Sequence, residues 1–151
     1  HSRGLFLPWK MMKFLFTLAL FLSLSACSST PSMPDEPLLD RYWRAIEIEG
    51  KPVTVLNNRA EPHLVLAAEN RTHGSDGCNR FNGSYETTAQ TLRFGRLAST
   101  MMACIPPVDL MSREFNAVLI ATNACRIQGK QLTLLDGEGR VRMRLEATAL
   151  K

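Results

Sequence analysis

The sequence predicts a mainly β (α+β) fold, namely a small antiparallel, barrel-like β-domain with one packed helix near residues 108–122. Three features favour this fold. Short apolar and β-branched runs are separated by turns rich in glycine, asparagine and aspartate. One segment carries apolar residues at helical spacing. The last run, residues 141–147, alternates apolar and charged side chains, which is typical of a strand with one buried face.

The amino-terminal half of the predicted domain contains short strand-like runs that are separated by turns. Trp43 is an apolar anchor of the first run. Residues 51–62 and 70–83 are dense in proline, glycine, asparagine and serine, so we expect the chain to turn there. The runs expected to form strands are 41–48, 63–67, 84–87 and 91–94, and the last two are expected to pair across a short turn.

One segment has the apolar spacing of a helix. Pro106 and Pro107 precede it, and proline suits the start of a helix because its missing N–H would have no partner there. Asn123 is the expected stop. The apolar stripe predicts a helix packed on a sheet, and it contains Met111, Phe115, Val118, Leu119 and Thr122.

The last third returns to strands. Residues 125–128, 131–135 and 141–147 are the expected strands, with glycine-containing turns between them. Three arginines, Arg140, Arg142 and Arg144, alternate there and therefore share one face. We interpret this face as solvated rather than as a patch for an anionic ligand.

The amino-terminal segment has the pattern of a lipoprotein signal. Lys13 is followed by an apolar run over residues 14–24, which is shorter than the ~20 residues that a membrane span needs. Small residues then lead to Cys27, in the sequence Leu-Ser-Ala-Cys. We therefore expect cleavage before Cys27 and lipidation of its thiol. Residues 1–26 are assigned to upstream residues and the signal peptide.

Residues 27–37 are interpreted as the lipidated cysteine and a flexible Ser/Pro-rich tether, and residues 38–151 as the folded domain. Acyl chains on Cys27 would attach the protein to the membrane. Ser28 follows the cysteine, which resembles the outer-membrane sorting class of lipoproteins. The expected location is the outer membrane, with the domain facing the periplasm.

The net charge does not indicate a nucleic-acid partner. The whole chain has a formal charge of +4, but three of its basic residues lie in the leader. The remainder carries 15 basic and 14 acidic residues, so it presents no strong field of one sign. We expect a monomer that binds no nucleic acid.

After Cys27 is assigned to lipid, Cys78, Cys104 and Cys125 remain, which allows one disulfide and one odd thiol in an exported protein. Cys78 lies in a loop-like segment, residues 77–85, rich in glycine and asparagine. Two interpretations are a tight corner pinned by a disulfide, which we favour, and a binding loop. The candidate binding residues are Asn79, Arg80, Asn82 and Tyr85.

Several motifs together resemble the META-domain family, also called HslJ-like. They are GCNRFNGSY from Gly77, LASTMMAC from Leu97, Glu114-Phe115 in the helix, and G-x-x-L-x-L-x-D from Gly129. The resemblance runs from about Trp43 to Leu145. It implies a small antiparallel β-domain with one helix on an exported or lipid-anchored bacterial protein, a disulfide between Cys78 and Cys104, and a link to heat shock, envelope stress and antibiotic tolerance.

No catalytic, metal or cofactor site is predicted. Cys125 could act as a nucleophile only beside a base such as His63 or His73, and nothing in their spacing favours this. The cysteines lack the paired short spacings of a zinc site. Met101 and Met102 could offer thioethers to Cu(I), but we expect them to pack in the core. Cys125 is expected to behave as a small buried apolar residue.

The sequence therefore favours a non-enzymatic, lipid-anchored envelope protein that binds an unidentified envelope partner or maintains the envelope under stress. An alternative is a periplasmic inhibitor of a lytic hydrolase such as lysozyme, which rests on analogy between small exported β-domains alone.

Overall fold

The computed structural model describes residues 33–55 and 60–149. The predicted signal peptide and Cys27 lie outside the described residues. Among residues 33–55 and 60–149, we find no helix with the length and hydrophobicity of a membrane span.

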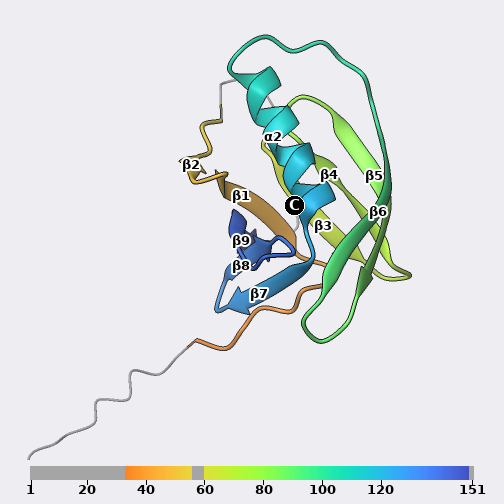
Figure 1. Ribbon diagram of the computed structural model, residues 1–151, viewed down its shortest axis with the longest axis vertical. Helices are drawn as coiled ribbons and strands as arrows, with labels where there is room; N and C mark the ends of the chain where they lie inside the picture. The colour runs from red at the N-terminus through yellow and green to blue at the C-terminus, as the bar shows by residue number, and fades with distance from the viewer. Residues whose placement is uncertain (1–32, 56–59, 150–151) are drawn as a thin grey trace, which may run out of the picture. The chain divides into compact units, whose positions relative to one another are not determined.

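The described part folds as one sheet and one helix (Figure 1). All strand pairs are antiparallel, and the strands are ordered β6-β5-β4-β3-β1-β9-β8-β7, with the short β2 paired to β1. The elements are β1 (Tyr42–Ile48), β2 (Lys51–Pro52), β3 (His63–Ala67), β4 (Arg71–Ser75), β5 (Arg80–Thr87), β6 (Leu92–Ser99), α2 (Val108–Ala121), β7 (Ala124–Gln128), β8 (Gln131–Leu135) and β9 (Val141–Thr148).

Within the sheet, β1, near the start of the domain, pairs with β9, at its end. Trp43 pairs with Ala147 across this ladder, and the register shifts between Ala45 and Glu47. The Trp43 side chain is fully buried, and its indole N–H donates to the Leu38 carbonyl oxygen at 2.9 Å. This bond satisfies the polar atom of the largest core side chain, as burial of an indole requires.

The two ends of the sheet approach each other at one point. Thr91 forms an isolated antiparallel bridge with Ala124, and the Leu92 amide donates to the Asn123 carbonyl at 3.2 Å. The rest of β6 pairs only with β5. The sheet is therefore a half-barrel that is joined at one corner and open along most of that seam.

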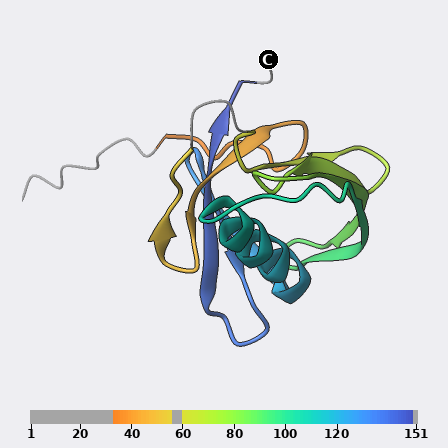
Figure 2. The ribbon, with the colours of Figure 1, turned by 90° about the horizontal axis from the view of Figure 1, so that it is seen from above.

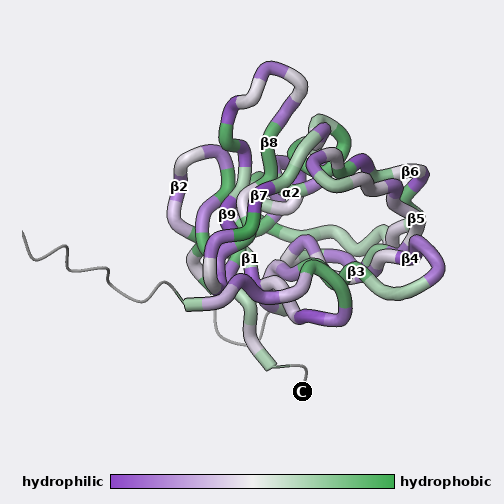
Figure 3. Tube along the Cα trace, turned by 90° about the horizontal axis from the view of Figure 1, so that it is seen from below, coloured by the Kyte–Doolittle hydropathy of each residue, from purple (hydrophilic) through white to green (hydrophobic). Residues whose placement is uncertain are grey.

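Helix α2 packs against the inside of this curved sheet. Figure 2 shows α2 between the part of the sheet formed by β3 to β6 and the part formed by β7 to β9. The Phe115 ring lies 5.8 Å from the Phe81 ring, centre to centre. The side chains of α2 that are buried are Val108, Ser112, Phe115, Val118 and Leu119. Short polar and apolar stretches alternate along the strands around this core (Figure 3).

The predicted fold class is confirmed, and the helix predicted at residues 108–122 is α2. The expected turn over residues 70–83 is wrong in part, because β4 occupies residues 71–75 and β5 already begins at Arg80. Thr72 is buried there, and its hydroxyl donates to the Val65 carbonyl at 2.9 Å. A Cβ added at Gly74 would lie 2.1 Å from the His63 carbonyl oxygen. Gly74 thus permits close approach of β3 and does not mark a turn.

The two arginines of β9, and Arg140 just before it, are matched by carboxylates. Arg142 lies 2.6 Å from Glu49, Arg144 lies 3.4 Å from Glu47, and Arg140 lies 2.9 Å from Asp136. These partners neutralise the face, in agreement with its interpretation as a solvated surface rather than an anion site.

Asp136 holds the turn between β8 and β9. Its side chain accepts hydrogen bonds from the amides of Glu138 and Arg140, both at 3.0 Å, and from the Arg140 guanidinium at 2.9 Å. Burial alone would raise the pKa of the Asp136 carboxyl, but these bonds and the Arg140 charge outweigh it and lower the pKa to about 2.

We predict that Asp136→Asn lowers the melting temperature at pH 7. A carboxyl with a lowered folded-state pKa stabilises the fold above its unfolded pKa of about 3.9, and this contribution is lost as the pH falls towards 2. The difference in melting temperature between wild type and variant should therefore be largest above pH 5 and should shrink between pH 4 and pH 2. Thermal unfolding followed by circular dichroism measures it. Glu138→Gln, at an exposed side chain, is the control. A difference that does not change with pH would contradict the assignment.

Candidate functional site

A tight corner connects β4 to β5 at residues 76–79. The Asp76 side chain is only 1% exposed, and its Oδ1 accepts hydrogen bonds from the Cys78 amide at 2.8 Å and the Asn79 amide at 2.6 Å. Gly77 has a φ of +94°, which favours glycine, and a Cβ there would lie 2.7 Å from the Met111 Cε. The corner therefore needs both the aspartate and the glycine.

The same carboxylate also links this corner to α2. The second oxygen, Oδ2, accepts a hydrogen bond from the Asn116 side-chain amide at 2.7 Å, and Asn116 also donates to the Ser112 carbonyl at 2.9 Å. A buried carboxylate is costly unless donors surround it, and here it has three. Asp76 therefore fixes the corner and the helix to each other.

The corner holds the segment that follows β6. We call residues 100–105 the strap. Asn79 Oδ1 accepts hydrogen bonds from the Met102 amide at 2.7 Å and the Thr100 hydroxyl at 3.0 Å. Arg80 and Thr100 add a further contact, because the Thr100 amide donates to the Arg80 carbonyl at 3.0 Å. The strap backbone is thus positioned by side chains of the corner.

A disulfide between Cys78 and Cys104 ties the far end of the strap to the corner. This is the pairing implied by the family resemblance, and it is confirmed. The sequence separation is 26 residues, so by loop-closure entropy the bond stabilises the fold by about 3.5 kcal/mol. Together with the Asn79 hydrogen bonds, the disulfide holds the strap at both ends.

The expectation that Met101 and Met102 pack in the core is wrong. Met101 is 96% exposed, Met102 is 60% exposed, and Ile105 is 71% exposed. The strap crosses the rim of the sheet with its backbone polar groups bound to Asn79, so its side chains face outward. A rigid segment that presents three large apolar side chains to solvent is unusual, because such groups are normally buried or cover a partner.

The four residues proposed for a binding loop do not form one site. Asn79 is used internally, as described above. Tyr85 is buried, and its hydroxyl donates to the Ala67 carbonyl at 2.8 Å. Arg80 and Asn82 are exposed on β5, and Asn82 pairs with His73 of β4. The tight corner pinned by a disulfide, which the sequence favoured, is present in the structure, and the exposed neighbour of this segment is the strap.

Sequence reasoning missed Asp76 and Asn116. An aspartate directly before Gly-Cys-Asn is a signal for a turn closed by its own side chain, and this signal was available. The role of Asn116 was not available, because it lies 40 positions from Asp76 in the chain.

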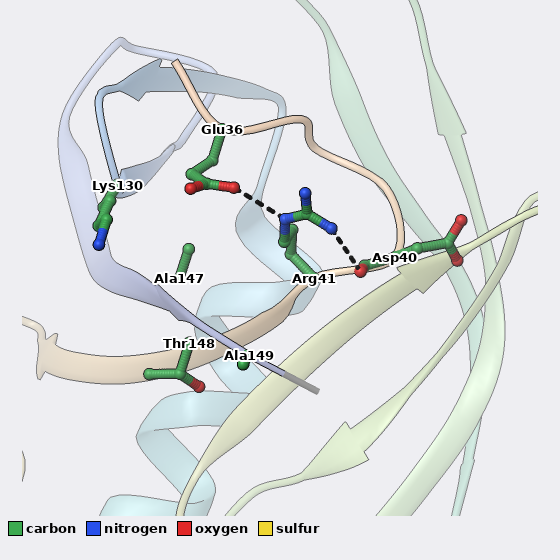
Figure 4. Close-up of a pocket in the computed structure, with 7 residues that line it drawn as sticks. All are labelled: Glu36, Asp40, Arg41, Lys130, Ala147, Thr148 and Ala149. Carbon is green, nitrogen blue, oxygen red and sulfur yellow. Dashed lines mark hydrogen bonds and ion pairs between the residues drawn. The ribbon is translucent and has the colours of Figure 1, made fainter. Parts of the chain in front are cut away.

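A hollow near the start of the domain does not add a chemical site. Its volume is about 440 Å³. The Arg41 guanidinium inside it donates to Glu36 at 2.8 Å and to the Asp40 carbonyl at 3.2 Å (Figure 4). The charges of Arg41 and Glu36 offset each other. The other lining residues are Lys130, Ala147, Thr148 and Ala149. We interpret the hollow as the place where the segment before β1 contacts the sheet.

Cys125 is the free cysteine of the described part of the chain. It lies half-buried in β7 against the core, and burial raises the pKa of its thiol. His63 and His73 lie on β3 and β4, which are separated from β7 by several strands. The Nδ1 atom of His63 lies 2.8 Å from the Glu61 carbonyl oxygen, and its ring stacks on Tyr42 at 4.3 Å. Neither histidine is placed to activate Cys125.

Across the described ranges, no three histidine, cysteine, aspartate or glutamate side chains are grouped so that they could hold a metal ion.

Comparisons with known proteins agree with this geometry. The family profile of the META domain matches residues 36–149. An NMR structure of a protein from Burkholderia xenovorans superposes with a TM-score of 0.60 at 22% identity, covering 85% of this chain and 99% of that chain. A second NMR structure has a TM-score of 0.57 at 24% identity, with 70% and 87% covered. At these identities the two structures show the fold alone. A search of curated proteins gives no match.

We predict that Asp76→Asn destabilises the protein by about 1–3 kcal/mol. The side-chain NH2 group of the asparagine would face an N–H donor that the wild-type carboxylate accepts, so at least one of the three hydrogen bonds would be lost. Chemical denaturation measures the change. Asp109→Asn, which removes an exposed ion pair with Arg113 in the same helix, is the matched control and should cost at most about 0.5 kcal/mol. Equal effects of the two substitutions would contradict the role of Asp76.

We also predict that native Cys125 reacts slowly with iodoacetamide. The raised pKa leaves less thiolate at neutral pH, and the half-buried thiol is less accessible. Mass spectrometry should find labelling at Cys125 much faster after unfolding in urea, and the native rate should rise only at higher pH. A native rate equal to the unfolded rate would indicate a reactive thiol instead.

Proposed function

The chain belongs to the META-domain family, and from this premise we propose that it is a lipid-anchored, non-enzymatic envelope protein that binds another envelope protein through its strap. In this proposal Cys27 carries the lipid, the outer membrane holds the anchor, and the domain faces the periplasm. Its role is to maintain the envelope under stress such as heat or antibiotics.

The observation that carries the proposal is the exposed apolar surface of the strap. Met101, Met102 and Ile105 are large, exposed and held on a backbone fixed by hydrogen bonds and a disulfide. A fixed segment loses little conformational entropy when it binds, so it suits recognition. Methionine side chains also adapt to the shape of a partner surface.

The polar groups around the strap support binding rather than catalysis. Asp76, Asn79 and Asn116 meet at the corner, but each is engaged in internal hydrogen bonds. Asn79 positions the strap, and Asp76 and Asn116 join the corner to α2. The half-buried Cys125 has a raised pKa, which disfavours a nucleophilic role.

The test is complementation of a deletion strain under heat, detergent and large antibiotics. The wild-type gene should restore growth, whereas Met101→Asp combined with Ile105→Asp should fail, although its melting temperature stays near the wild-type value because both side chains are exposed. Cys27→Ser should also fail if anchoring is needed. Val55→Asp, at another exposed apolar residue, is the control.

Full complementation by the strap variant would refute the role of the strap, and unchanged growth of the deletion strain would refute the stress role. Protection of cells against added lysozyme by the purified domain would favour the alternative of a periplasmic inhibitor of a lytic hydrolase.

A further inference from the structure

The edge of the sheet at β6 is open. In an antiparallel ladder the backbone groups of successive residues point to alternate sides. The Thr100 amide points to β5, where it donates to Arg80. By alternation, the backbone N–H and C=O groups of Ser99 and Leu97 point away from β5, and no backbone hydrogen bond joins them to another described segment.

A groove runs beside this open edge. Its volume is about 530 Å³. One wall is the edge of β6 at Gly95, Arg96, Leu97 and Ser99, and the other is α2 at Asn116 and Ile120, with Phe81 also lining it. Ile120 is 82% exposed, so a large apolar side chain stands on the rim.

We propose that this edge and groove bind an extended peptide of another protein, which adds to the sheet as a strand beside β6. The unpaired backbone groups would supply the hydrogen bonds, and the groove would take apolar side chains at alternate positions. Residues 97–99 of β6 pair regularly with β5, and pairing resumes at residues 92–94 beyond the bulge opposite Ser84. A peptide of about six residues would span this edge. The proposal does not rest on the strap or on the lipid anchor.

The charge of the edge selects the kind of peptide. Arg96 is an exposed residue of the groove lining and makes no ion pair with the described residues. A glutamate or aspartate of the peptide would face it. Cross-strand pairs of opposite charge are favourable, whereas like charges directly opposite are not.

The same charge disfavours a second copy of this chain as the occupant. The strand β6 has the sequence LRFGRLAS, with two arginines and no acidic residue. Antiparallel pairing of two such edges would bring two positively charged strands side by side, with no acidic side chain on either strand to offset the charge. An acidic and apolar segment of a different protein is therefore the better match.

The experiment uses two labelled hexapeptides, one alternating valine and glutamate and the other alternating valine and lysine, with binding to the purified protein followed by fluorescence anisotropy. The wild type should prefer the glutamate peptide. Arg96→Glu should reverse this preference, with a change of about fivefold or more for each peptide. Arg71→Glu, at an exposed arginine of β4 outside the groove, should leave the preference unchanged.

Two further variants test the groove and the edge. Ile120→Asp should weaken binding of the glutamate peptide, whereas Ile105→Asp on the strap should not. Ser99→Pro removes one outward N–H from an exposed position and should weaken binding, whereas Ser99→Ala should not. Each variant is first checked for a wild-type circular dichroism spectrum.

Three outcomes would overturn the proposal. They are no binding of the glutamate peptide, a preference that Arg96→Glu does not change, and a dimer in sedimentation that Ser99→Pro dissolves, which would make a second copy the occupant. Because the strap variants are scored by complementation and these variants by peptide binding, failure of one proposal is distinguishable from failure of the other.

Discussion

The carboxylate of Asp76 is the interaction on which the candidate site depends. It gathers the amides of Cys78 and Asn79 and the side chain of Asn116 around one buried charge. The bonds to the two amides set the direction of the corner. They thereby place Asn79 where its side chain can hold the strap. The third sets the position of α2. A neutral side chain of the same shape could not accept all three hydrogen bonds. The positions of the corner, the helix and the strap therefore all depend on this one carboxylate.

The incomplete closure of the sheet explains where the exposed surfaces lie. The two ends meet near Thr91 and Ala124, while α2 fills the interior. With the helix inside, β6 cannot continue its pairing to β7 along its whole length. One result is the open edge beside Ile120, and another is the long connection from β6 to α2, which must pass over the rim of the sheet. Both surfaces follow from placing one helix inside a half-barrel.

Local patterns in the sequence predicted the elements whose residues alternate or repeat clearly, such as α2 and the strand from Val141. They did not predict β4, because its glycine and threonine are explained by close contact with β3, which is a property of the neighbouring strand. They also wrongly predicted that Met101 is buried. Hydrophobicity alone does not show whether another part of the chain packs over a side chain. The family resemblance supplied the disulfide pairing, which spacing had left open.

The disulfide has a consequence for the integrity of the chain. Cys78 and Cys104 enclose both β5 and β6 within one covalent ring. If a protease cleaved the exposed strap beside Met101, the two fragments would stay linked through this bond, and the strands on both sides would keep their places in the sheet. Cleavage of the strap, where Met101 is 96% exposed, would therefore not separate the molecule into parts. A domain with this arrangement can be nicked and still remain one covalently linked molecule.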